Sequence, residues 1–373
     1  MTAPRTNVAI LSVGAIGTGD HEQGIPALVE CLIELSQDID LSVYSLLNVN
    51  PDRAPPGIRL RPIPFRTPFV QIDLVLMSLM VLWDHIRRPY DGVHTVAAYP
   101  FGWVGVRLGR LLNVPCLVAL QGQELANLPS ADFGDLRNHR RSKRIADACE
   151  RADVLTALSR FQALGLSELG IAPERAVVIP FGIDTSRFTY CEKLLTAPYR
   201  FLHVAYAHPV KDMETLLDTF RIINEQVDSR LVIVGHGHIG AQTETLVEKY
   251  SLKGNVELFE SVPNRKVANY FQTAHFLLHT SRYESQGVVF NEAMASGVVV
   301  CATRVGLAAD LGEEFCILSD VGDSGCLARK IMEVVSDNDR FEYLRSNGRR
   351  WSTQYDVNWT AAKYQDIYRQ FIV

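Results

Sequence analysis

Two glutamates, Glu284 and Glu292, lie on either side of Gly287: Glu284 is in the polar loop that ends at this glycine, and Glu292 is about one turn into the predicted helix that follows. The residues after this glycine have the apolar spacing of an α-helix, and the run 298–302, VVVCA, is typical of a buried parallel strand. The first backbone N–H groups of a helix have no intrahelical acceptor, and together with the helix dipole they suit an anion such as a diphosphate. The predicted phosphate donors are the amides of Gly287, Val288 and Val289.

The two glutamates could instead form the carboxylate pair of a glycoside hydrolase. On one helix, a separation of eight residues would place them about 12 Å apart at about 1.5 Å per residue. Glycoside hydrolysis needs a carboxylate separation of roughly 5 to 9.5 Å. We therefore favour two separate hydroxyl-binding roles, one carboxylate for a sugar ring and the other for a ribose, with phosphates between them.

The segment 284–297, ESQGVVFNEAMASG, resembles the E-x7-E signature of the retaining family 4 glycosyltransferases, which have the GT-B fold. Two further segments, ADVLTALS at 152–159 and VVIPFGIDTSRF at 177–188, resemble motifs of the first domain of that family. The resemblance implies that a sugar is transferred from a nucleotide-diphospho-sugar with retained anomeric configuration. It also implies that no metal or other cofactor takes part.

The resemblance also implies roles for individual residues of the second half of the chain. Glu284 would hold hydroxyls of the donor sugar, and Glu292 would hold the ribose. Lys211, together with the helix amides, would stabilise the charge of the leaving diphosphate. The nucleotide base would lie near Gly235 and Val262.

This chain departs from the family pattern at two positions. Ala207 occupies the position of an arginine that contacts the donor diphosphate, and His208 is the candidate replacement. Gln121 stands where relatives often carry a histidine near the reacting sugar, and an amide can bind a hydroxyl but cannot carry charge. These departures leave open a GT-B protein that has lost catalysis and serves as a binding or scaffold subunit. A nucleotide-sugar epimerase is a further alternative.

The first half of the chain is expected to contact the acceptor. The resemblance places three of its residues near ligands: Gly19 near the donor phosphates, and His21 and His94 near the acceptor. We expect a UDP-linked donor, with GDP and ADP left open by the sequence. The acceptor is expected to be a glycan, a lipid-linked molecule or a small molecule, as in polysaccharide biosynthesis.

Strands and helices alternate along the 373 residues, which predicts α/β architecture in two domains. The resemblance implies the GT-B arrangement of two Rossmann-like, doubly wound parallel-sheet domains that face each other across a cleft. The predicted segments are an acceptor domain at 1–184, a linker at 185–198, a donor domain at 199–357 and a helix at 358–373 that packs back on the first domain.

Composition narrows the function further. A net charge of −5 argues against a general nucleic-acid-binding protein, and the seven cysteines show no C-x2-C pair. With a start that lacks secretory-signal features, this favours a cytoplasmic protein. The two D-x-D sequences, at 38–40 and 337–339, are expected to lie on turns rather than to bind a metal.

Two segments bear on membranes. The apolar run 69–83 is shorter than the roughly 20 residues of a membrane span, and a buried helix is favoured over an interfacial one. The basic cluster 137–144 is interpreted as a solvated helix face, with an alternative role as a patch for an anionic acceptor or for anionic lipid at the inner membrane face.

Overall fold

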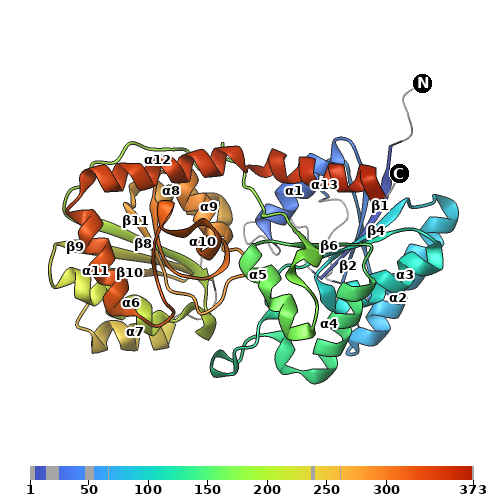
Figure 1. Cartoon of the computed structure of the whole chain (residues 1–373), viewed down its shortest axis with the longest axis horizontal. Coiled ribbons are helices and arrows are strands. Elements are labelled where there is room, and N and C mark those ends of the chain that lie inside the picture. The colour runs from blue at the N-terminus through green and yellow to red at the C-terminus, as the bar shows by residue number, and fades with distance from the viewer. Residues whose placement is uncertain are drawn as a thin grey trace. The chain divides into compact units, whose positions relative to one another are not determined.

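The computed structural model describes residues 5–13, 25–46, 54–65, 67–236, 240–260 and 262–371. The chain forms two compact units, one made of Met1–Phe181 and Val357–Val373 and the other of Gly182–Asp356. Each unit contains one parallel sheet with helices between most consecutive strands (Figure 1). The predicted α/β class with two parallel-sheet domains is confirmed.

The first unit contains a seven-stranded sheet with the order β3-β2-β1-β4-β5-β6-β7. All of its strand pairs are parallel. The strands are β1 (Asn7–Ser12), β2 (Asp40–Ser45), β3 (Ile58–Pro62), β4 (Gly92–Val96), β5 (Cys116–Ala119), β6 (Val154–Ala157) and β7 (Ala176–Val178). Every residue of β1 and β4 is buried, as is typical of strands covered by helices on both faces.

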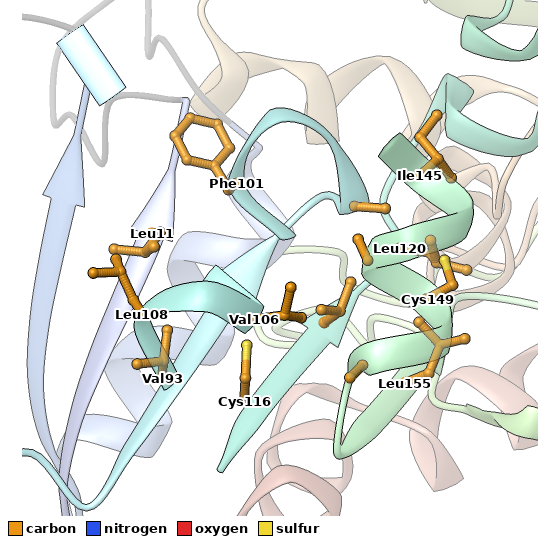
Figure 2. Packing of buried hydrophobic residues seen from close by; sticks show 14 of the residues in the cluster. Leu11, Val93, Phe101, Val106, Leu108, Cys116, Leu120, Ile145, Cys149 and Leu155 are labelled. Carbon is orange, nitrogen blue, oxygen red and sulfur yellow. The ribbon is translucent and has the colours of Figure 1, made fainter. Parts of the chain in front are cut away.

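The α-helices of the first unit are α1 (Pro26–Ser36), α2 (Val70–Arg87), α3 (Trp103–Leu112), α4 (His139–Arg151), α5 (Arg160–Leu164) and α13 (Val357–Phe371). Apolar side chains of α3 and α4, such as Val106 and Ile145, pack on the strands in the core (Figure 2). Close contact between α3 and β4 depends on Gly105, because a Cβ there would lie 2.2 Å from Thr95 Cγ2.

The helix α13 is separated in sequence from the rest of the first unit but completes its core. Tyr364 and Tyr368 are buried, and α13 contacts α1. The hydroxyl of Tyr368 lies 2.7 Å from Nδ1 of His94, and the Tyr364 ring stacks on the same imidazole with centroids 5.3 Å apart. The hydroxyl of Thr360 donates to the Pro180 carbonyl at 2.8 Å.

The second unit contains a six-stranded sheet with the order β10-β9-β8-β11-β12-β13, also parallel throughout. Its strands are β8 (Tyr199–Tyr206), β9 (Ser229–His236), β10 (Val256–Phe259), β11 (Phe276–His279), β12 (Val299–Thr303) and β13 (Cys316–Ser319). Its helices are α6 (Met213–Asn224), α7 (Gly240–Lys249), α8 (Asn264–Thr273), α9 (Val288–Ala295), α10 (Gly306–Leu311), α11 (Ser324–Val335) and α12 (Asn338–Gln354).

The segment 185–198, predicted to be a linker, packs on the second unit. The ammonium group of Lys193 donates to the carbonyls of Phe271 at 3.0 Å and Gln272 at 2.9 Å. The buried guanidinium of Arg345 donates to the Cys191 carbonyl at 2.7 Å. Charged groups inside this unit therefore hold the segment in place.

The helix α2 differs from its sequence interpretation. Leu74, Met77 and Val81 are buried, whereas apolar side chains on another face are exposed. The apolar residues of α2 are distributed around the whole helix, but only one side of it packs on the core. The helix is therefore not buried, contrary to what the sequence favoured. No helix in the described part of the chain has both the length and the apolar character to span a bilayer.

Candidate active site

The second sheet reverses its strand order between β8 and β11, which are hydrogen-bonded neighbours near its centre. Open α/β sheets bind ligands at the carboxyl ends of the strands at such a switch point. Lys211 lies in the loop after β8, and Glu284 lies in the loop after β11. The topology therefore brings together two residues that are far apart in the sequence.

Lys211 and Glu284 form an almost buried ion pair. The Lys211 Nζ lies 2.5 Å from Glu284 Oε1, and the side chains are 9% and 13% exposed, respectively. The same carboxylate oxygen lies 2.8 Å from Nε2 of His279 and accepts from the hydroxyl of Ser281 at 2.7 Å. The carboxylate thus has one orientation, set by a cation, an imidazole and a hydroxyl.

These contacts keep the carboxylate ionised. Burial favours the neutral acid, but Lys211 and His279 more than offset it and hold the pKa of Glu284 well below its usual range. Burial lowers the pKa of His279 despite the adjacent Glu284. His279 is therefore a neutral imidazole that donates its Nε2–H to the carboxylate.

A second histidine lies behind this network. His203 on β8 stacks on His279 with ring centroids 5.3 Å apart, and its Nδ1 donates to the Leu278 carbonyl at 2.9 Å. Burial lowers the pKa of His203 to about 3, so its ring is also neutral. The two stacked neutral rings support the Glu284 carboxylate, which His279 contacts directly.

The loops that carry Lys211 and Glu284 are joined directly. The Arg282 amide donates to the Val210 carbonyl at 2.7 Å, and its guanidinium pairs with Asp212 at 3.1 Å. The Thr280 hydroxyl donates to the carbonyls of Lys211 and Asp212 at 3.3 and 3.1 Å. The distance between the cation and the carboxylate is consequently fixed by backbone as well as by side chains.

The predicted phosphate-binding turn has a conformation that requires glycine. Gly287 has φ +81°, and a Cβ there would lie 2.4 Å from the Phe290 ring. It is the N-cap of α9, so the first amides of that helix belong to Val288 and Val289. Glu292 is half-buried on the second turn of α9.

Gly306 fits closely under the Glu284 loop. It has φ +55°, and a Cβ there would lie 2.6 Å from the Gln286 carbonyl oxygen and 2.8 Å from Glu284 Cβ. The next amide, of Leu307, donates to the same Gln286 carbonyl at 2.8 Å. A larger residue at 306 would therefore displace the loop that carries the carboxylate.

Sequence comparisons identify the family of this chain. The family model described as glycosyl transferases group 1 matches residues 192–351, and the model described as glycosyltransferase family 4 matches residues 27–187. The chain belongs to the family 4 glycosyltransferases of GT-B fold. An uncharacterised glycosyltransferase of Methanocaldococcus jannaschii is 24% identical over 354 residues, which are 93% of this chain and 94% of that protein.

Solved structures share the fold of this glycosyltransferase. Sucrose-phosphate synthase from Thermosynechococcus elongatus aligns with a TM-score of 0.81 and 20% identity, over 98% of this chain and 99% of that one. Anabaena HepE, in complex with UDP-glucose, aligns with a TM-score of 0.76 and 18% identity, over 98% and 99% of the two chains.

The other predicted donor residues of the glycosyltransferase lie at the same sheet edge. Gly235 is near the end of β9, and Val262 follows β10. His208 lies in the loop after β8, beside Ala207, and its Nδ1 accepts from the Val210 amide at 3.1 Å. A neutral His208 therefore carries its proton on Nε2, and the ring caps its own loop.

An aromatic residue at the end of β8, directly before this loop, was missed by the sequence interpretation. The ring centroid of Tyr206 lies 5.0 Å from Lys211 Nζ, and its ring lies 6.0 Å from that of His208. Burial raises the pKa of the Tyr206 hydroxyl, which is therefore protonated at neutral pH. An aromatic side chain five residues before a predicted catalytic lysine was the available signal.

The first unit places Gln121 directly after β5, at the carboxyl edge of its sheet. The buried carboxylate of Glu124 accepts from the Gln121 amide at 2.9 Å, the Gly122 amide at 2.5 Å and the Ala98 amide at 3.4 Å. Burial raises the pKa of Glu124, and the backbone donors oppose that shift. Glu124, which the sequence interpretation did not select, thus positions Gln121.

Three predicted site residues of the first unit remain: Gly19, expected near the donor phosphates, and His21 and His94, expected near the acceptor. His94 is 2% exposed and lies against Tyr364 and Tyr368, and burial lowers its pKa to about 3. These contacts give it a packing role between β4 and α13. Gly19 and His21 lie outside the described residues.

The acidic D-x-D sequences have structural contacts. Asp40 pairs with Arg88, and Asp337 caps α12 by accepting from the Arg340 amide at 2.9 Å. Within the described ranges, no group of three or more His, Cys, Asp or Glu residues is arranged to hold a metal ion.

Proposed function

We propose that this glycosyltransferase moves a sugar from a UDP-linked donor to a hydroxyl of a glycan, lipid-linked or small-molecule acceptor, with retained configuration and without a metal. The observation that carries the proposal is the Lys211–Glu284–His279 network at the switch point, next to the start of α9. The UDP-glucose complex of the structurally similar HepE supports the choice of donor class.

In this mechanism the bond between the anomeric carbon and the diphosphate oxygen breaks, and its electron pair remains on the diphosphate. Lys211 and the amides of Val288 and Val289 would stabilise that charge through electrostatic interactions already in place. The acceptor oxygen forms the new bond on the same face of the sugar, and its proton passes to the departing diphosphate oxygen.

Glu284 would accept hydrogen bonds from donor-sugar hydroxyls. A carboxylate whose pKa is held low binds hydroxyl donors as an anion over the whole neutral range, and charge-assisted bonds are stronger than neutral ones. Glu292 would accept from the ribose hydroxyls. Binding of the donor then requires Lys211 to interact with both the carboxylate and the diphosphate.

The test is thermal unfolding of the purified protein with UDP, GDP, ADP and their sugar conjugates, followed by product analysis with the donor that binds. A ligand at 100 times its Kd should add about 2.7 kcal/mol to the unfolding free energy. We expect a UDP-selective shift that Glu292→Ala removes and that the exposed control Glu257→Ala retains. Product with the retained anomer, formed equally with and without EDTA, would complete the test.

The alternative of a non-catalytic binding protein is motivated by Ala207 and Gln121, which replace a cation and an ionisable ring. Nucleotide binding with no transfer or hydrolysis of any donor would favour it. Conversion of the nucleotide sugar to its epimer with no acceptor present would favour an epimerase. The absence of any nucleotide-dependent shift would contradict the proposed donor site itself.

A further inference from the structure

The helix α2 exposes a continuous apolar ridge. Its members recur every three or four residues, which places them on one helix face, and are between 46% and 77% exposed. They are Phe69, Ile72, Val75, Leu79, Trp83 and Ile86. Isolated apolar residues are common on protein surfaces, but a contiguous patch marks an interaction site.

The ridge belongs to a wider layer on one face of the first sheet. The connections β3–α2–β4, β4–α3–β5 and β5–α4–β6 all advance in one direction across the sheet, so right-handed crossovers place these helices on one face. The helix α2 contacts α3, and α3 contacts α4 (Figure 1). The outer sides of the three helices therefore form one surface.

This surface carries an excess of positive charge around the apolar ridge. Among the described residues, four of its cations have no carboxylate partner: Arg87, Arg110, Arg140 and Lys143. Asp73 is buried and Asp84 binds Tyr44 at 2.7 Å, so neither acid of α2 neutralises the ridge. Glu150 is an exposed acid on α4.

Aromatic and cationic side chains are also paired on this surface. The Arg87 guanidinium lies 4.3 Å from the Trp83 ring centroid, and those of Arg107 and Arg144 lie 4.2 and 4.7 Å from that of Trp103. Tryptophan is enriched at the boundary between lipid tails and headgroups. An amphipathic helix with an apolar face and flanking cations lies in that boundary plane.

We propose that α2 docks on an anionic lipid bilayer, with the apolar ridge among the upper acyl chains and the cations of α3 and α4 on the headgroups. The charge pattern favours this occupant over a second copy of the chain. An isologous dimer through α2 would bring identical cation-rich rims together, which is unfavourable. The inference depends on the first unit alone and does not require the proposed donor chemistry.

The experiment is sedimentation of the full chain with sucrose-loaded vesicles of phosphatidylcholine alone or with about 30% phosphatidylglycerol, at low and high salt. We expect binding to the anionic vesicles that weakens as salt rises. The double variant Leu79→Glu/Trp83→Glu should lower the partition coefficient at least about tenfold. Arg110→Glu/Lys143→Glu should reduce binding to the anionic vesicles.

Two matched controls are available. Leu194→Ser removes an even more exposed apolar side chain in the second unit, and Lys363→Glu reverses a charge on α13; both should bind like the wild type. The variant Trp83→Phe tests the position of this side chain in the bilayer by fluorescence, without requiring that binding be lost. It should still bind vesicles, but brominated lipids should quench its fluorescence less than that of the wild type.

Three results would overturn the proposal. The first is a wild-type protein that stays in the supernatant with both vesicles at low salt. The second is binding that the Leu79/Trp83 variant retains while its circular dichroism is native. The third is a dimer in light scattering that Leu79→Glu dissociates, which would assign the surface to a second copy of the chain.

Discussion

The two units share a doubly wound parallel sheet but carry different chemistry at its carboxyl edge. The second unit holds an ion pair, Lys211 with Glu284, supported by two stacked neutral histidines. In the described part of the first unit, the corresponding edge presents the neutral amide Gln121, and the nearby carboxylate of Glu124 binds backbone N–H groups.

Under the proposed function, the two units would serve the two halves of the reaction. A fixed cation and carboxylate suit a donor whose negative charge changes as a bond breaks. A neutral amide on a rigid turn suits an acceptor hydroxyl, which needs orientation rather than charge. We therefore expect substitutions in the second unit to affect the chemical step most strongly.

The largest effect is expected for Glu284→Gln. The amide retains the size of the carboxylate but loses its charge, and two charge-assisted bonds contribute about 1.5 to 3 kcal/mol each. We expect kcat to fall about 10³-fold, measured by initial rates of product formation, while Glu257→Gln remains at wild-type rates. A loss of less than tenfold would show that the carboxylate is not central to transfer.

The next largest effect is expected for Lys211→Met, which removes the cation but keeps the length of the side chain. Transfer should fall about 10²-fold, the scale seen when one charge-stabilising donor is lost. Because Glu284 would remain buried without its cation, the unfolding free energy should fall by about 3 kcal/mol in denaturant titration. Lys211→Arg should recover much of that stability. Unchanged stability in the methionine variant would contradict the ion pair.

A smaller loss is expected for Gln121→Ala in the first unit. Removing one neutral hydrogen bond costs about 1 kcal/mol, so kcat/KM should fall roughly fivefold to tenfold. Kinetics with varied acceptor should place the change in KM for the acceptor. If this variant were as impaired as Glu284→Gln, the contrast between the two units would not hold.

The smallest contrast concerns acid stability, because both units bury a histidine whose pKa is about 3. An unfolded histidine gains a proton below about pH 6.5, whereas folded His94 does not until about pH 3. Stability is therefore lost as pH falls through this window. Between pH 7 and pH 5, His94→Phe should lose about 2 kcal/mol less than the wild type in denaturant titrations. An identical pH dependence would contradict a neutral, buried His94.

Local spacing was sufficient to predict most strands and the glycine turn before α9, and the resemblance of the segment 284–297 indicated the family. Periodicity placed strands before Lys211 and Glu284, and parallel strands end at one edge, so the second sheet followed from the sequence. The sequence placed Gly287 between a polar loop and a helical pattern, and in the structure it is the N-cap of α9.

The rest of the site depends on the order of the strands in the sheet, which the sequence alone does not reveal. His203 and His279 are separated by 75 residues and meet only because β11 pairs with β8. Glu124 lies in a short polar turn, where an acid is ordinarily solvated. The sequence interpretation took α2 for a buried helix because apolar residues occur on all of its sides. Hydrophobicity alone does not show which side packs on the core.

The position of α13 has a consequence for synthesis on the ribosome. The second unit is contiguous, from Gly182 to Asp356, and is completely translated before α13 emerges. The first unit, although most of it is made earlier, lacks Tyr364 and Tyr368 against His94 until then. Domains fold as units during translation, so the first unit, whose synthesis begins first, completes its folding last. A released chain truncated after Asp356 should therefore present a protease-resistant second unit and a protease-sensitive first unit.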